Sequence, residues 1–264
     1  MGGLGVMGLS LFLLLVIAAS ILLAVGSIWL AKRTFSDSVG QEDNSALSPF
    51  LTGVGLVFGA LLGFTVVVAW EQFSSAETHV ANESSSLTTM YRQTVAMPAP
   101  EQTQLRVLLR KYTKAAEGPD WARQESGSGG TGDVAREAIT EMYRVVGSQP
   151  PGEASSTANG GFFGQLGVLT SERNTRILDA KPRIPWLLWC GLLFGALVFI
   201  ALMGSMRLKS RRRHVLLSSA VAVLLGLLLY IVFCLDHPFG SQLGVTSEPF
   251  EHSLQVFDSV DRGT

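Results

Sequence analysis

The sequence is poor in charge. Only 16% of its 264 residues are Asp, Glu, Lys or Arg, whereas soluble domains carry about 25%. The formal net charge is −1, which gives no support to nucleic acid as a partner. Mean hydropathy is +0.34. These values exclude an ordinary soluble domain and indicate an integral membrane protein.

Cysteine is rare and metal-ligand spacings are missing. Cys190 and Cys234 both lie in apolar segments. A disulfide between them is conceivable if that membrane face is oxidising, but we favour two free thiols that act as small apolar residues. The histidines are scattered, with no CxxC or HExxH spacing, so we expect no metal and no cofactor. No Ser–His–Asp pattern stands out, and we expect no enzyme.

Four apolar runs dominate what remains, and none contains Asp, Glu, Lys or Arg. Each is close to the ~20 residues that a helix needs to cross a bilayer. They cover residues 4–31, 49–70, 186–206 and 214–235. The first lacks a basic start and is longer than a signal-peptide core, so we expect it to be retained. Backbone groups in lipid must be satisfied internally, so the prediction is an all-α protein with four transmembrane helices.

The absence of charge within these runs also bears on function. Intramembrane carboxylates and bases mark proton and ion relays. Their absence argues against a proton-coupled transporter. Any ion path would be lined by apolar, backbone or hydroxyl groups, with Thr52 and Thr65 as the obvious hydroxyls. Apolar constrictions that gate by dewetting keep a channel possible.

The second apolar run is predicted to continue as a helix beyond Trp70. No Gly or Pro occurs between Gly63 and Pro98. Phe73, Val80 and Leu87 recur every seven residues, with Ala76, Glu83 and Met90 between them, which indicates a partly apolar seam. A helical extramembrane domain therefore follows the second span without a break.

The predicted organisation has four parts. They are residues 1–70 with transmembrane helices 1 and 2, 71–185 with the extramembrane domain, 186–235 with helices 3 and 4, and the tail 236–264. Inside the second part we expect helices after Pro98, over residues 133–147, and from about Leu166 to Pro182. Residues 121–132 and 148–161 are rich in Gly, Ser and Pro and are predicted to be loops.

Basic residues set the expected orientation in the cell membrane. Loop 207–213, "RLKSRRR", is strongly basic, and loop 32–48 begins with Lys32 and Arg33. The positive-inside rule places both loops in the cytoplasm, and residues 71–185 and the tail outside. A second basic cluster before the third span argues the other way. It consists of Arg173, Arg176, Lys181 and Arg183.

One face of the second span carries a row of small residues. Gly55, Gly59 and Gly63 are spaced by four. Small residues let helices approach closely in lipid, where no hydrophobic drive brings them together. The row has two interpretations. It is either a contact between helices of one protomer or the face that lines an axial path in a homo-oligomer.

Several segments resemble a known family. "LLGFTVVVAWEQF", "LDHPFGSQLGVTSEPF", "PAPEQTQLRVLLRKY" and "SERNTRILDAKPRIPWLLW" are similar to the bestrophin-like membrane proteins, a group named for its similarity to bestrophin anion channels. Those channels are helical pentamers whose second span lines an axial pore and continues past the membrane. The resemblance therefore implies an oligomeric, anion-conducting channel, with Phe73 beside the glycine row as a pore-side candidate.

The resemblance also implies a structural motif. Its members are Arg173, Arg176, Pro185, Asp236, Pro238, Phe239 and Gly240. In this motif Pro238 fixes the exit from the fourth span. We further expect Asp236 to pair with Arg173 or Arg176.

Three departures from true bestrophins limit the analogy. Thr65-Val66-Val67-Val68 replaces polar residues and makes the path drier. After Gly240 only Glu248 and Glu251 are acidic within "SQLGVTSEPFEH", and calcium needs about six to eight oxygen ligands. We therefore expect no calcium gating. The expected orientation also differs, because true bestrophins keep the region between spans 2 and 3 in the cytoplasm.

A second function remains open. The chain is alternatively a non-conducting scaffold or sensor whose residues 71–185 bind a protein partner. The partly apolar seam and the two predicted loops suit this reading equally well.

Overall fold

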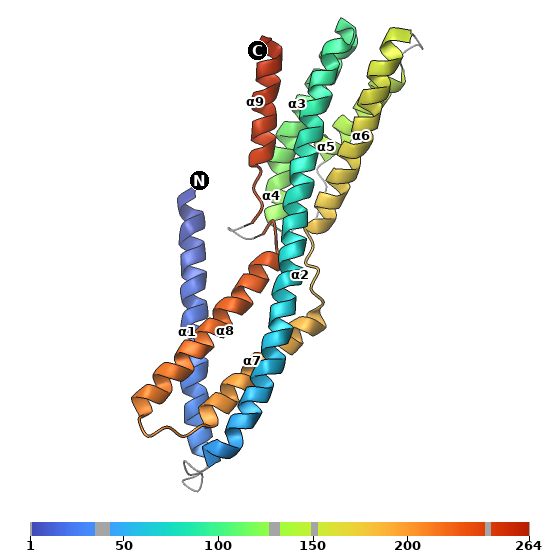
Figure 1. Ribbon diagram of the computed structural model, residues 1–264. Helices are drawn as coiled ribbons and strands as arrows, with labels where there is room; N and C mark the ends of the chain where they lie inside the picture. Colours follow the sequence, from blue (N-terminus) through green and yellow to red (C-terminus); the bar gives the residue numbers. More distant parts are fainter. Residues whose placement is uncertain (1, 35–42, 127–132, 149–152, 241–243, 264) are drawn as a thin grey trace. The chain divides into compact units, whose positions relative to one another are not determined.

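The computed structural model describes residues 2–34, 43–126, 133–148, 153–240 and 244–263, and every regular element in these ranges is a helix (Figure 1). The fold class is therefore all-α, as the sequence predicts. The elements are α1 (Gly2–Thr34), α2 (Asp43–Gln93), the 3₁₀ turn η1 (Thr94–Ala96), α3 (Ala99–Glu117), α4 (Pro119–Glu125), α5 (Asp133–Gly147), α6 (Glu153–Asp179), α7 (Trp186–Ser205), α8 (Arg211–Asp236) and α9 (Glu248–Arg262).

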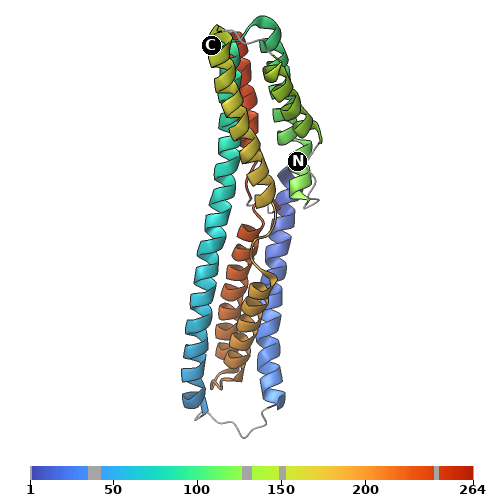
Figure 2. The same ribbon diagram turned by 90° about the vertical axis from the view of Figure 1, so that its right-hand side faces the viewer.

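The chain divides into two compact units. We call Met1–Glu71 with Arg183–Asp236 the membrane unit, and Gln72–Pro182 with His237–Thr264 the polar unit. Helices α1, α2, α7 and α8 are each long and apolar enough to cross a membrane. Helix α2 is uninterrupted from Asp43 to Gln93 (Figure 2). The predicted continuation beyond Trp70 is thus confirmed.

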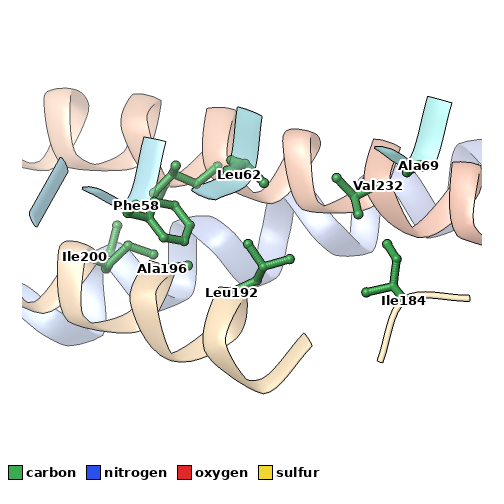
Figure 3. Close-up of a cluster of buried hydrophobic side chains, with 11 residues drawn as sticks. Phe58, Leu62, Ala69, Ile184, Leu192, Ala196, Ile200 and Val232 are labelled. Carbon is green, nitrogen blue, oxygen red and sulfur yellow. The ribbon is translucent and has the colours of Figure 1, made fainter. Parts of the chain in front are cut away.

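In the membrane unit, α1 packs closely against α7 and α8. A Cβ on Gly204 of α7 would lie 2.8 Å from the carbonyl carbon of Ser27, and a Cβ on Gly226 of α8 would collide with the Ser20 hydroxyl. Helix α2 instead reaches its neighbours through a large side chain, because Phe58 lies beside the α7 residues Ala196 and Ile200 (Figure 3). Small residues thus allow α1 to pack closely on α7 and α8, whereas an aromatic side chain packs α2 against α7.

In the polar unit, the seam of α2 is buried as predicted. Phe73, Ala76, Val80, Glu83, Leu87 and Met90 are all buried. Helix α3 begins after Pro98 and ends at Gly118, as the proline and glycine signals indicate. Helix α5 occupies the predicted residues 133–147.

Three helical segments of the polar unit differ from the sequence prediction. Helix α4 occupies 119–125, where a loop was predicted from residue 121, because Pro119 opens the helix and Trp121 is buried. Helix α6 begins at Glu153, within the predicted loop 148–161, and packing of Phe162 in the core supports it. Helix α9 lies in the supposed tail. Residues 127–132 and 149–152 of the predicted loops lie outside the described part.

Candidate functional site

The glycine row of α2 divides into a packed part and an open part. A Cβ on Gly55 would lie 2.8 Å from Cε2 of Phe199 on α7, so the ring fills the space that a side chain would need. Gly59 and Gly63 have nothing within 4 Å of the same position. All three line a groove of about 370 Å³, together with Phe199 of α7 and Leu225 and Leu228 of α8. Gly55 is therefore a packing residue, whereas Gly59 and Gly63 border the groove without close contact.

The predicted hydroxyl and aromatic candidates divide in the same way. Thr52 is exposed and donates to the carbonyl oxygen of Ser48 at 3.0 Å. Thr65 is buried and donates to that of Leu61 at 2.8 Å. Phe73 is buried in the polar unit. Thr65 thus shares the inward face of α2, while Thr52 lies with the open glycines.

The outward surface of α2 is broad and apolar. Leu56 and Phe64 are 74% and 75% exposed, and Val57 and Val67 are also exposed. The opposite side is buried against the other spans, through Phe58, Leu62 and Ala69. One side of α2 is therefore used by its own protomer, and the other is left to lipid or to another copy.

Asp236 organises the entry to α7. Its Oδ1 accepts the backbone N–H groups of Arg183 and Ile184, both at 3.0 Å, and its Oδ2 accepts the indole N–H of Trp189 at 3.2 Å. Pro185 is the N-cap of α7. The carboxylate thus satisfies amides beside the helix start that would otherwise lack acceptors. The expected ion pair of Asp236 with Arg173 or Arg176 is not among the described interactions, and backbone amides take its place.

The rest of this motif forms a turn in the polar unit. The Gly240 N–H donates to the His237 carbonyl oxygen at 3.2 Å, and the Val245 N–H donates to the Pro238 carbonyl oxygen at 2.8 Å. The buried Phe239 ring meets the Trp121 ring edge-on, with 5.4 Å between centroids. This arrangement is a structural anchor for the segment before α9.

One charge cluster is buried between α2, α3, α4 and α6. The Arg176 guanidinium donates to Glu83, with Nε to Oε2 at 2.6 Å, and the side chains of both residues are at most 1% exposed. The Tyr112 hydroxyl donates to Glu83 Oε1 at 2.6 Å, and Arg176 Nη1 donates to the side-chain oxygen of Gln124. Burial and the Glu83 charge raise the pKa of Tyr112 well above its ordinary value. Burial opposes the charge on Arg176, but Glu83 outweighs it and raises the pKa of that guanidinium.

Arg173 lies one helical turn before Arg176 and is also buried. Its Nε and Nη2 have no hydrogen-bond partner in the part of the chain that the structure describes. Burial raises the pKa of Asp120, although the charges of Arg173 and Arg176 oppose that rise. Arg173 therefore acts through charge on a neighbouring carboxyl rather than through a closed ion pair.

A second cluster fastens α9 to the other helices of the polar unit. Asp261 accepts from the Tyr91 hydroxyl at 2.8 Å and from Arg106 and Arg110 at 2.7 Å. The Tyr91 ring stacks on Phe257, with 4.0 Å between centroids. Burial raises the pKa of Asp261, but the hydrogen bonds from Arg110 and Tyr91 outweigh it, so the pKa is lowered. Sequence reasoning missed this cluster, although Phe250, Ser253 and Phe257 recur at helical spacing.

The possible metal ligands and the two cysteines are further candidates for a functional site. In the described ranges, no group of three or more His, Cys, Asp or Glu side chains is placed to hold a metal ion. Cys190 and Cys234 do not form a disulfide with each other in this structure. The clusters position helices, whereas Gly59 and Gly63 of α2 have no atom within 4 Å of a Cβ position.

These observations define a four-span helical membrane protein whose second span extends into a polar helical unit. The chain belongs to the Bestrophin-like family, because the profile of the Bestrophin-like domain matches residues 18–250. The predicted family resemblance is thereby confirmed. No curated protein matches the chain.

Solved structures share the fold. One variant of a bacterial bestrophin homologue from Klebsiella pneumoniae has a TM-score of 0.69 at 10% identity, covering 93% of this chain and 97% of that chain. Another has a TM-score of 0.65 at 12% identity, covering 94% and 96%. A variant described only as a membrane protein reaches 0.70 at 10% identity, covering 93% and 97%. At these identities the likeness concerns the fold alone.

Proposed function

We propose that the protein is a homo-oligomeric ion channel, anion-conducting and pentameric by analogy with bestrophins, with α2 lining the path. The observation that carries the proposal is an exposed flank of α2 that makes no close contact with the other spans. It presents Thr52, Gly59 and Gly63. Small residues on an open face suit close approach of the same helix from neighbouring protomers.

The proposed path is dry. No charged side chain lies in residues 49–70, so ions would pass apolar side chains and exposed backbone. Narrow apolar constrictions conduct only when they are wetted, which provides a gate without a moving plug. Glu71 follows directly after Trp70 and would mark one end of the path.

The roles of the α2 residues differ in this proposal. Gly59 and Gly63 face the path, and Thr52 supplies a hydroxyl near its other end. Gly55 and Thr65 hold α2 to its own protomer, through Phe199 and through burial in the core. We place the protein in the cell membrane with loops 32–48 and 207–213 in the cytoplasm.

The test is chloride and potassium flux from liposomes that contain the purified protein. Gly59→Leu should abolish chloride flux, because a Cβ at this position meets no atom of its own protomer within 4 Å and the larger side chain would occupy the proposed path. Gly53→Leu is the matched control. It adds the same side chain to the same helix, but at a position about 120° around the helix axis from Gly59. There Gly53 borders a different groove, which α7 residues such as Gly191 also line.

Each outcome decides between the two functions. The channel is supported if Gly59→Leu abolishes chloride flux and Gly53→Leu preserves it. Both variants must be folded and have the same oligomer mass as the wild type. Wild-type protein that is folded and oligomeric yet gives no flux above empty vesicles, across pH and voltage, contradicts it. That result would favour the scaffold, whose polar unit exposes apolar residues such as Val107 and Phe163.

A further inference from the structure

A second groove in the membrane unit lies between α1 and α7. Its volume is about 770 Å³. It runs from Ala19 to Thr34 on α1 and from Leu197 to Ser205 on α7, and its walls are apolar apart from a few hydroxyls. This groove does not involve the α2 glycine row and plays no part in the proposed ion path.

The groove has a closed floor and an open wall. Gly204 and Ser27 bring the backbones of α7 and α1 together, and Ala31 and Ile200 are buried beside them. Gly26 lines the groove and has no atom within 4 Å of its Cβ position. The space is therefore a surface groove that a flexible apolar chain can fill.

The groove is longer than one leaflet of a bilayer. Fifteen steps separate Ala19 from Thr34, which is about 22 Å of helix at ~1.5 Å per residue. The hydrocarbon core of a bilayer is about 30 Å thick. A single acyl chain that enters from one surface would follow the groove to beyond the middle of the membrane.

One end of the groove is strongly basic. Thr34 and Ser205 are the last residues of α1 and α7. Lys32 and Arg33 are exposed in the last turn of α1, and residues 207–213 contain five basic residues and no acid. The Arg33 guanidinium lies 5.5 Å from the centre of the exposed Trp29 ring, a pair typical of the membrane–water interface.

The basic segment is held in place within the membrane unit. The Asn44 side chain donates to the Arg207 carbonyl oxygen at 2.6 Å, and the Arg207 backbone N–H donates to the side-chain oxygen of Asn44 at 2.8 Å. This two-point contact fixes the backbone between α7 and α8 against the start of α2. The charges after Ser205 are therefore presented on a braced loop.

We propose that this groove binds an anionic phospholipid, with one acyl chain along the α1–α7 walls and the phosphate against Lys32, Arg33 and Lys209. Charge selects the occupant. A lipid headgroup supplies the negative charge that the basic end lacks, and it is already located at this depth. A second copy of the chain would bring the same loops 32–48 and 207–213 to this end, and together they carry seven basic and three acidic residues, so like charges would meet.

The test adds phosphatidylglycerol or phosphatidylcholine to the purified protein in neutral detergent. The measurements are the melting temperature and the mass of lipid adducts by native mass spectrometry. Phosphatidylglycerol should raise the melting temperature and remain bound, and phosphatidylcholine should do neither. The double change Lys32→Gln with Arg33→Gln should weaken phosphatidylglycerol binding about 30-fold, since each base near a membrane surface contributes about fivefold.

Filling the groove provides the second arm. Gly26→Leu should abolish the phosphatidylglycerol adduct without unfolding the protein. Gly191→Leu, in another apolar groove with equally open surroundings, should leave the adduct intact. Equal binding of the two lipids, or an unchanged adduct in Gly26→Leu, overturns the proposal. So does loss of oligomer mass in Gly26→Leu with lipid binding unchanged, because a second copy would then fill the groove.

Discussion

The two units of this protein bury polar groups in different ways. In the membrane unit, Ser20, Ser27 and Thr65 donate to carbonyl oxygens of their own helices. In the polar unit, Glu83 and Arg176 pair across helices in full burial. The apolar spans of the first unit meet through close approach and shape, with hydrogen bonds such as those of Asp236 at their ends. The helices of the second unit are joined by buried charge and hydrogen bonds.

This difference follows from the surroundings of each unit. Lipid offers no hydrophobic drive between apolar helices, so contact depends on small residues such as Gly204 and Gly226. In the polar unit, hydrophobic burial drives helix packing, and a buried ion pair then fixes one arrangement because a lone buried charge is costly. Removing a buried charge should therefore lower stability mainly in the polar unit. Adding bulk at a helix contact should lower it mainly in the membrane unit.

The largest expected effect is at the buried ion pair. Glu83→Ala leaves the Arg176 guanidinium, which is 1% exposed, without its carboxylate. The expected loss of stability is about 3–5 kcal/mol, measured by chemical unfolding in detergent. Glu141→Ala breaks an exposed pair with Arg144 and should cost well under about 1 kcal/mol. Equal losses in the two variants would remove the distinction between buried and exposed pairs.

A steric change should break the membrane unit instead. Gly204→Val would place atoms within 2.8 Å of the Ser27 backbone, so α1 must shift away from α7. We expect a loss of about 1–3 kcal/mol, as for other overpacked contacts, read from thermal unfolding. Gly191→Val has no atom within 4 Å of its Cβ and should be neutral. A neutral Gly204→Val would contradict the close approach of α1 and α7.

The smallest effect concerns a buried carboxyl without partners. Both carboxyl oxygens of Glu101 lack hydrogen-bond partners in the described ranges, and burial raises its pKa above the ordinary 4.5. Folding thus favours the protonated form. That stability is complete below about pH 4.5 and is lost as pH rises through the raised pKa.

Glu101→Gln cannot ionise, so its stability relative to the wild type should increase as pH rises through the raised pKa of Glu101. The difference in melting temperature between variant and wild type, followed from acid to neutral pH, tests this. Glu137→Gln, at an exposed side chain, is the control and should follow the wild type. A constant difference for Glu101→Gln at every pH would contradict the assignment.

Much of the fold was predictable from the sequence because its signals are local. Apolar runs of bilayer length give the four spans, and proline and glycine mark the ends of α3. Buried α2 residues such as Val80 and Leu87 follow a seven-residue spacing that the sequence itself displays. Helices α4 and α9 were not predicted from the sequence, because tertiary contacts stabilise them. Trp121 packs on Phe239 and Phe250, and these contacts join distant parts of the sequence.

The candidate site was less predictable for a similar reason. Spacing placed Gly55, Gly59 and Gly63 in one row, but only the position of Phe199 separates Gly55 from the others. Asp236 was expected to find a basic partner, and backbone amides of Arg183 and Ile184 bind it instead. Sequence reveals residue type and periodicity, whereas the choice of partner depends on which helices meet.

The most direct test of the proposed path is whether water reaches Gly63. Gly63→Cys, with Cys190→Ala and Cys234→Ala, is exposed in liposomes to a charged thiol reagent that cannot cross lipid. Thiols react as thiolates and need water to ionise. The proposal predicts that Gly63→Cys is modified and that chloride flux falls with the same time course. The control is Glu71→Cys in the same background. If Glu71→Cys reacts and Gly63→Cys does not, although both oligomers conduct chloride, then α2 faces lipid and does not line the path.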